Sequence, residues 1–120
     1  MWKIKRSVIQ DACEASRNYI PDEFMCFLGG DKKKQTVSEI VMLPTMNSKN
    51  SASVDMNAMP IDNTIIGSLH SHPGGPPAPS RADRSFFRRH QINVIIGGGL
   101  TEEETAVYDA AGKPLKVIVE

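Results

Sequence analysis

The chain has 120 residues, of which 40% are hydrophobic and 23% are charged, as is ordinary for one soluble globular domain. Because 14 basic residues balance 14 acidic residues, the charge gives no reason to expect nucleic acid or an anionic membrane as a partner. Cys13 and Cys26 are too few for a disulfide framework, and the sequence leaves open whether they pair. With no apolar run of about 18 residues and no signal-peptide pattern, we expect a cytoplasmic single-domain protein over residues 1–120, either a monomer or a homodimer.

Hydrophobic periodicity and turn residues predict, in chain order, a helix, two strands, a long loop, a strand, a second helix and three further strands. The helices are expected at residues 7–19 and 80–90, the strands at residues 24–28, 36–43, 65–70, 93–96, 105–108 and 115–119, and the loop at residues 45–63 with one short strand near Ser53 and Val54. This order indicates an α/β or α+β domain with one mixed sheet.

Glycine, proline and clustered charge mark several connections between these elements. Gly29-Gly30-Asp31 predicts a hairpin turn, with the lysines at residues 32–34 at its solvated tip. Residues 73–79, rich in proline and glycine, are not expected to form regular structure. The positive charge of Arg88-Arg89-His90 lies at the end of the second predicted helix, where it interacts favourably with the helix dipole.

A pair of histidines at the end of one predicted strand is the first candidate for chemistry. Side chains two apart on an extended chain point to the same side, so His70 and His72 project together and Ser71 points away. Two converging imidazoles suit zinc, which binds histidine nitrogen at about 2.0–2.1 Å. Such a pair alone also suits a partly buried strand end without a metal.

Asp83 is the natural third ligand of a catalytic zinc site, which keeps its fourth position open for water. Seven residues separate His72 from Ser80, and two separate Ser80 from Asp83, so Asp83 falls in the first turn of the second helix. The Pro/Gly-rich segment is long enough to fold this helix start back over the strand end. Ser80 at the N-cap with an acidic residue three positions later also makes an ordinary helix start. A His-His-Asp site, however, accounts for the histidine pair, the Pro/Gly-rich segment and this helix start together.

A hydrolase with such a site needs a group that takes a proton from water and passes it to the leaving amine. Asp22 and Glu23 are candidates because they precede the first buried strand, and they should point to opposite faces if the strand begins there. The residues alone do not choose between the two, and either suits a solvated carboxylate at a strand edge.

Together these residues resemble the JAMM or MPN-plus metalloprotease family. Its pattern is an upstream Glu, a His-Ser/Thr-His-Pro segment, and then a Ser and an Asp at fixed intervals. Glu23, His70-Ser71-His72-Pro73, Ser80 and Asp83 meet this pattern, and the similarity covers nearly the whole chain. The resemblance implies a curved mixed sheet flanked by helices, similar to that of cytidine deaminases.

The resemblance also implies roles and a function. His70, His72 and Asp83 would hold one zinc ion per chain, Glu23 would be the general base, and Ser80 would donate a hydrogen bond to the oxyanion. The chain would be a zinc metallo-isopeptidase or peptidase that cleaves after the C-terminal tail of a ubiquitin-like modifier or sulfur-carrier protein, as in small stand-alone prokaryotic members. The alternatives are a non-catalytic protein-binding scaffold, which the intact ligand set weighs against, and a zinc peptidase acting on other peptides.

Overall fold

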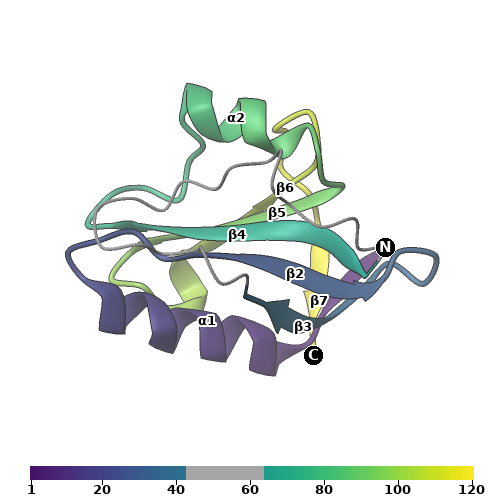
Figure 1. The fold of residues 1–120 in the computed structure, drawn as a ribbon, viewed down its shortest axis with the longest axis horizontal. Coiled ribbons are helices and arrows are strands. Elements are labelled where there is room, and N and C mark those ends of the chain that lie inside the picture. The colour runs from purple at the N-terminus through teal and green to yellow at the C-terminus, as the bar shows by residue number, and fades with distance from the viewer. Residues whose placement is uncertain (43–63) are drawn as a thin grey trace.

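The computed structural model describes residues 1–42 and 64–120, which form one seven-stranded mixed sheet with helices on both faces (Figure 1). The elements are β1 (Trp2–Ile4), α1 (Arg6–Tyr19), β2 (Met25–Asp31), β3 (Thr36–Val41), β4 (Ile65–Pro73), α2 (Arg81–Phe87), β5 (Ile92–Gly98), the 3-10 helix η2 (Glu102–Glu104), β6 (Thr105–Tyr108) and β7 (Val117–Val119). The strand order is β6-β5-β4-β2-β3-β1-β7. Strand β4 runs parallel to β5, and β1 runs parallel to β3 and β7, whereas the other neighbours are antiparallel. The predicted α+β domain with a mixed sheet is confirmed.

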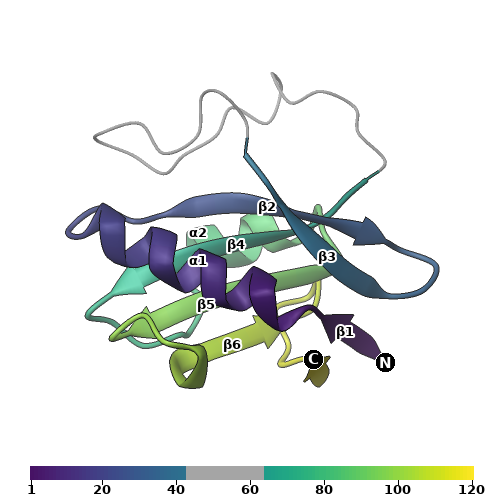
Figure 2. The same cartoon turned by 90° about the horizontal axis from the view of Figure 1, so that it is seen from below.

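The main hydrophobic core lies between the sheet and α1, which runs across one face of it (Figure 2). The buried face of α1 is built from residues spaced three and four apart, as an amphipathic helix requires, and they are Val8, Ile9, Ala12, Cys13 and Ser16. The central strand β2 is buried from Met25 to Gly29, so the predicted buried strand is present and is covered on both faces.

Helix α2 lies on the face opposite α1, and a buried asparagine fastens its C-terminal end to the sheet (Figure 1). The side-chain amide of Asn93, in β5, donates hydrogen bonds to the carbonyl oxygens of Phe87 at 3.4 Å and His90 at 3.1 Å. The Oδ1 atom of Asn93 accepts a hydrogen bond from the Ser68 hydroxyl at 2.6 Å. All the polar atoms of this side chain are therefore engaged, and the helix end is fixed to β5.

The predicted hairpin turn at Gly29-Gly30-Asp31 is wrong. Strand β2 continues through both glycines to Asp31, and the chain reverses over residues 32–35, so the lysines do lie at the tip. The pairing with β3 shifts register between Gly29 and Gly30. A Cβ atom on Gly30 would overlap the carbonyl oxygen of Thr36, so the close approach of β3 requires glycine there.

Other element boundaries differ from the predicted ones by a few residues. Strand β1 was not predicted, β4 continues to Pro73, and α2 ends at Phe87, before the expected end. Leu43 and the predicted loop over residues 45–63, with its short strand, lie outside the described residues. Both cysteines are buried free thiols that do not pair. Within the described ranges, no helix is long and apolar enough to cross a bilayer.

Candidate metal centre

His70 and His72 lie at the C-terminal end of β4, which has a hydrogen-bonded neighbour on each side. Strand β2 places Met25 opposite His70, and β5 runs alongside with Gly97 level with His72. The two imidazole rings project to the same face, with their centroids 5.2 Å apart. Ser71 points away, and its hydroxyl accepts a hydrogen bond from the backbone amide of Phe24 at 2.8 Å. The alternation expected from the His-x-His spacing is therefore present.

Ser80 and Asp83 form a reciprocal capping box at the start of α2. The Ser80 hydroxyl accepts a hydrogen bond from the backbone amide of Asp83 at 3.1 Å, and Asp83 Oδ2 accepts one from the Ser80 amide at 2.8 Å. The cap satisfies backbone donors that a helix start leaves unpaired, and it also holds the Asp83 carboxylate in one orientation. The ordinary helix-start interpretation is correct, and it does not exclude a ligand role for the same carboxylate.

The helix start brings Asp83 onto the two histidines. Asp83 Oδ1 lies 2.9 Å from His70 Nε2, and Asp83 Oδ2 lies 3.1 Å from His72 Nε2. One ligand atom from each of the three residues falls within 4.8 Å of the others. Ligand atoms placed about 2.0–2.1 Å from a tetrahedral zinc ion lie roughly 3.3 Å apart, so these separations are close to those of a zinc site.

The buried nitrogen of His70 supports a metal more directly. Its side chain is 7% exposed, and Nε2 has no geometrically aligned hydrogen bond, although the carboxylate oxygen is near. A buried polar atom without an aligned partner is unusual in a folded protein. A cation between the imidazoles and the carboxylate would satisfy all three groups at once. The donor set of two histidines and one aspartate is that of a catalytic zinc site with one position left for water.

The surroundings of the Asp83 carboxyl group stabilise its ionised form. Burial raises its pKa, but contact with the His70 imidazole and its charge, together with the Ser80 amide and hydroxyl, outweighs burial and holds the pKa well below its ordinary value. The group is therefore ionised throughout the neutral range, which metal ligation requires.

His72 is oriented by the backbone of the loop that follows it. Its Nδ1 atom lies 3.2 Å from the carbonyl oxygen of Pro76, which favours the tautomer that donates from Nδ1 and leaves Nε2 free to bind a metal. This Pro/Gly loop, residues 74–79, is bonded to β5 because the Gly98 amide donates to the Gly75 carbonyl at 2.6 Å. At Gly97, a Cβ atom would lie 2.5 Å from the nitrogen of Pro77, so only glycine lets the loop lie this close.

Aromatic rings support the other histidine. The ring of Phe87 lies 6.2 Å from the ring of His70 and stacks on Tyr108 at 5.8 Å. Pro76, Phe87, Asn93 and Tyr108 were not predicted from the sequence as supports of the site. Phe87 could have been found, because it follows Asp83 by four residues and so shares its helix face. The other three carry no local signal, since their partners come from distant parts of the chain.

Of the residues predicted for the site, Glu23 stands outside this cluster. It is exposed and immediately precedes Phe24, and no hydrogen bond or ion pair with another described residue engages its carboxylate. Ser80 is also exposed, with its hydroxyl in the cap. The structure thus brings His70, His72 and Asp83 together and places Ser80 beside Asp83, while the roles of Glu23 and Ser80 stay predictions.

Comparisons with known proteins agree with this arrangement. A model of prokaryotic homologues of the JAB domain matches residues 5–110. A probable metalloprotease from Haloferax volcanii is 29% identical over 119 residues, covering 92% of this chain and 74% of that protein.

Solved structures of JAB1/MPN and JAMM proteins are also similar to this chain. A JAB1/MPN domain protein from Archaeoglobus fulgidus has a TM-score of 0.77 at 28% identity, covering 98% of this chain and 97% of that one. A structure described as JAMM, a metalloprotease-like zinc site in the proteasome and signalosome, has a TM-score of 0.77 at 26% identity, covering 100% of this chain and 98% of that one. The chain therefore belongs to the prokaryotic JAB/MPN (JAMM) domain family and is a homologue of a probable metalloprotease.

Proposed function

We propose that this protein is a zinc-dependent isopeptidase or peptidase that cleaves the bond after the C-terminal tail of a ubiquitin-like modifier or sulfur-carrier protein. The observation that carries the proposal is the meeting of His70, His72 and Asp83, with a buried His70 nitrogen that lacks an aligned hydrogen bond. Zinc bound there would supply Lewis acidity and a water whose pKa is lowered to about 7.

The residues of this chain then have distinct tasks. The Glu23 carboxylate takes a proton from the attacking water as the new carbon–oxygen bond forms, and returns it to the amine nitrogen as the carbon–nitrogen bond breaks. The Ser80 hydroxyl donates a hydrogen bond to the carbonyl oxygen of the scissile bond, on which negative charge develops. His70, His72 and Asp83 keep their positions through the supports described above.

The strand register favours Glu23 over Asp22 as the base. Phe24 and Ser71 exchange hydrogen bonds, from the Phe24 amide to the Ser71 hydroxyl at 2.8 Å and from the Ser71 amide to the Phe24 carbonyl at 2.9 Å. Met25 is paired with His70, and the same antiparallel register, if continued by two residues beyond the start of β2, would put Glu23 level with His72. Cross-strand partners share a face, which would turn Glu23 and not Asp22 toward the imidazoles.

The substrate class rests on the family resemblance together with the physics of an extended tail. A Gly-Gly tail has no side chains to obstruct it and can lie along a sheet edge through backbone hydrogen bonds. A zinc peptidase acting on other peptides would use the same residues, so the substrate must be determined by assay. A non-catalytic scaffold would have no need of the complete donor set.

The test compares Glu23→Gln with Asp22→Asn, a matched loss of one carboxylate at the neighbouring exposed position. Each purified variant is assayed for zinc content and for cleavage of a modifier joined through an isopeptide bond, a modifier joined as a linear fusion, and an unrelated peptide. We expect wild-type zinc content in both variants, with cleavage lost only in Glu23→Gln. Normal cleavage by Glu23→Gln would remove Glu23 from the mechanism, and zinc-loaded wild-type protein that cleaves none of the substrates would support the scaffold.

A further inference from the structure

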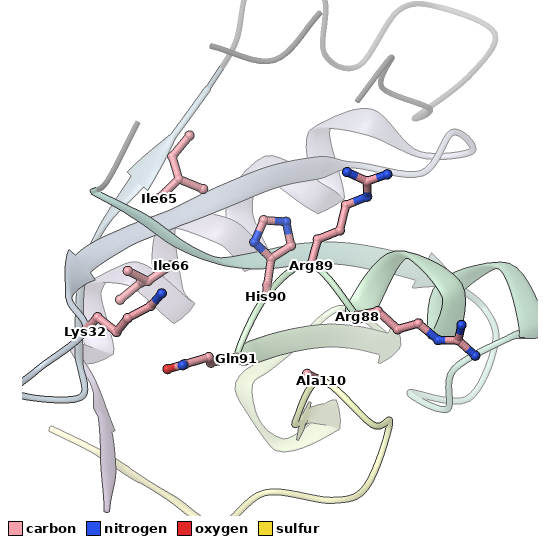
Figure 3. Close-up of a pocket in the computed structure, with 8 residues that line it drawn as sticks. All are labelled: Lys32, Ile65, Ile66, Arg88, Arg89, His90, Gln91 and Ala110. Carbon is pink, nitrogen blue, oxygen red and sulfur yellow. The ribbon is translucent and has the colours of Figure 1, made fainter. Parts of the chain in front are cut away.

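A second polar site lies beside the C-terminal end of α2, where a cavity of about 240 Å³ is lined by residues from separate parts of the chain (Figure 3). Lys32 comes from the turn between β2 and β3, Ile65 and Ile66 begin β4, and Arg88 and Arg89 follow α2. Along β4, His70 comes four residues after Ile66, the nearer of the two lining isoleucines, which corresponds to roughly 13 Å in an extended strand. The cavity is therefore separate from the metal centre.

Positive charge surrounds this cavity. Lys32, Arg88 and Arg89 all line it, and no aspartate or glutamate of the described residues does. Within residues 1–42 and 64–120, none of these three cations forms an ion pair. Figure 3 shows Lys32 on one side of His90 and the two arginines on the other. Unpaired cations gathered around a concave surface create a positive potential that attracts anions.

His90 forms part of the wall and provides an independent observation. His90 is 8% exposed, and its Nε2 atom is buried with no hydrogen-bond partner among the described residues. The rings of Phe27 and Phe86 pack against it at 5.4 and 5.6 Å and offer no conventional partner. Burial, together with the positive charges of Arg89 and Lys32, lowers the pKa of His90 to about 4.

We propose that the cavity binds a dianionic oxyanion of the phosphate class, either free phosphate or a phosphomonoester. Three cations that have no ion-pair partner in the described part of the chain exceed the charge of a single carboxylate and match a dianion better. An arginine fork binds two phosphate oxygens at once, and a lysine ammonium adds a compact charge from the opposite side. This site does not depend on the proposed peptidase activity.

The test is a titration of the zinc-loaded full chain with inorganic phosphate at constant ionic strength, followed by the NMR resonances of the His90 ring. We expect saturable shifts in the wild type. Lys32→Gln and Arg89→Gln each remove one exposed cation and should weaken binding by about tenfold, as expected for a charge-assisted hydrogen bond. Lys33→Gln is the matched control, because Lys33 is the next residue of the same turn and does not line the cavity. Its affinity should equal that of the wild type.

The same titration with glycerol phosphate separates the two sources of the anion: tighter binding than inorganic phosphate assigns a phosphomonoester, and weaker binding assigns the free ion. Three results would overturn the proposal. The first is an equal response to chloride, the second is equal phosphate affinity in all the variants, and the third is phosphate-induced shifts at His70 and His72 with none at His90. Binding of a glutamate-rich peptide without binding of phosphate would also overturn it, in favour of a protein-docking surface.

Discussion

The Tyr108 hydroxyl donates a hydrogen bond to the carbonyl oxygen of Pro77 over 2.5 Å, across a separation of 31 residues in the chain. This contact ties β6 to the Pro/Gly loop. The adjacent carbonyl, that of Pro76, holds Nδ1 of His72, and the Tyr108 ring stacks on Phe87, which in turn contacts His70. One side chain outside the metal centre therefore supports both imidazoles.

Tyr108→Phe should weaken zinc binding by about tenfold, the lower end of the range for losing an outer-shell contact. The variant keeps the ring that stacks on Phe87 and loses only the hydrogen bond to Pro77. Tyr108→Leu loses the aromatic stacking as well and should weaken binding further. Zinc affinity is measured by competition with a chromophoric chelator, and an unchanged affinity in both variants would show that the loop holds His72 without help from β6.

The two tasks of Ser80 can be separated by substitution. Ser80→Ala should lower the free energy of unfolding by about 1 kcal/mol, because alanine cannot cap α2, whereas Ser80→Gly should cost only a few tenths. Both variants lack the hydroxyl, so if Ser80 stabilises the oxyanion, both should lose about 10²–10³-fold in kcat. Stability is followed by urea unfolding, and kcat is measured with whichever of the three assay substrates the wild type cleaves. If Ser80→Gly keeps normal kcat, Ser80 is a cap alone.

Asn93→Ala should destabilise the protein by about 3 kcal/mol, because it leaves buried polar groups without partners. The groups affected are the carbonyl oxygens of Phe87 and His90 and the hydroxyl of Ser68. Asn18→Ala is the matched control, since Asn18 is exposed on α1 and should change stability little. Urea unfolding of both variants provides the measurement, and equal stabilities would mean that Asn93 does not fasten α2.

His90 should make stability depend on pH in a defined direction. Burial, with the positive charges of Arg89 and Lys32, lowers its pKa from 6.5 to about 4 in the folded chain. Between these values the unfolded chain binds a proton that the folded chain does not, so stability falls as pH is lowered through this window and His90 contributes no further change below it. The loss is at most about 3 kcal/mol.

The measurement is the free energy of unfolding of wild type and His90→Gln, in phosphate-free buffer from neutral pH to pH 4. The difference between the two curves isolates His90 from other titrating groups, including the metal ligands. We expect the wild type to lose more stability than the variant over this range. Parallel curves would show that His90 protonates in the folded protein as readily as in the unfolded chain.

The sequence predicted the grouping of His70, His72 and Asp83 because the information for it is largely local. The spacing of His70 and His72 determines which face of β4 they share, and Ser80 with Asp83 makes a helix start whatever lies around it. Neither the histidine segment nor the Ser80–Asp83 segment indicates by itself that the helix start folds back onto β4. The Pro/Gly loop achieves it through hydrogen bonds to β5, a contact that sequence spacing does not encode.

The errors have a common physical origin in long-range pairing. Gly29 and Gly30 look like a turn when only their neighbours are considered, but their role is to admit β3 at close range. Strand β1 is only three residues long, and it is a strand because β3 and β7 pair with it on either side. Asn93 and Tyr108 were likewise assigned only to strands, since their partners lie far away in the chain.

X-ray absorption at the zinc edge, on protein loaded with one equivalent of zinc, tests the central claim most directly. The account predicts a four-coordinate ion with two imidazole nitrogens and two oxygens at about 2.0–2.1 Å, the oxygens coming from Asp83 and a water. Sulfur scattering at about 2.3 Å, or a shell without imidazole, would place the metal elsewhere and contradict the assignment of His70, His72 and Asp83.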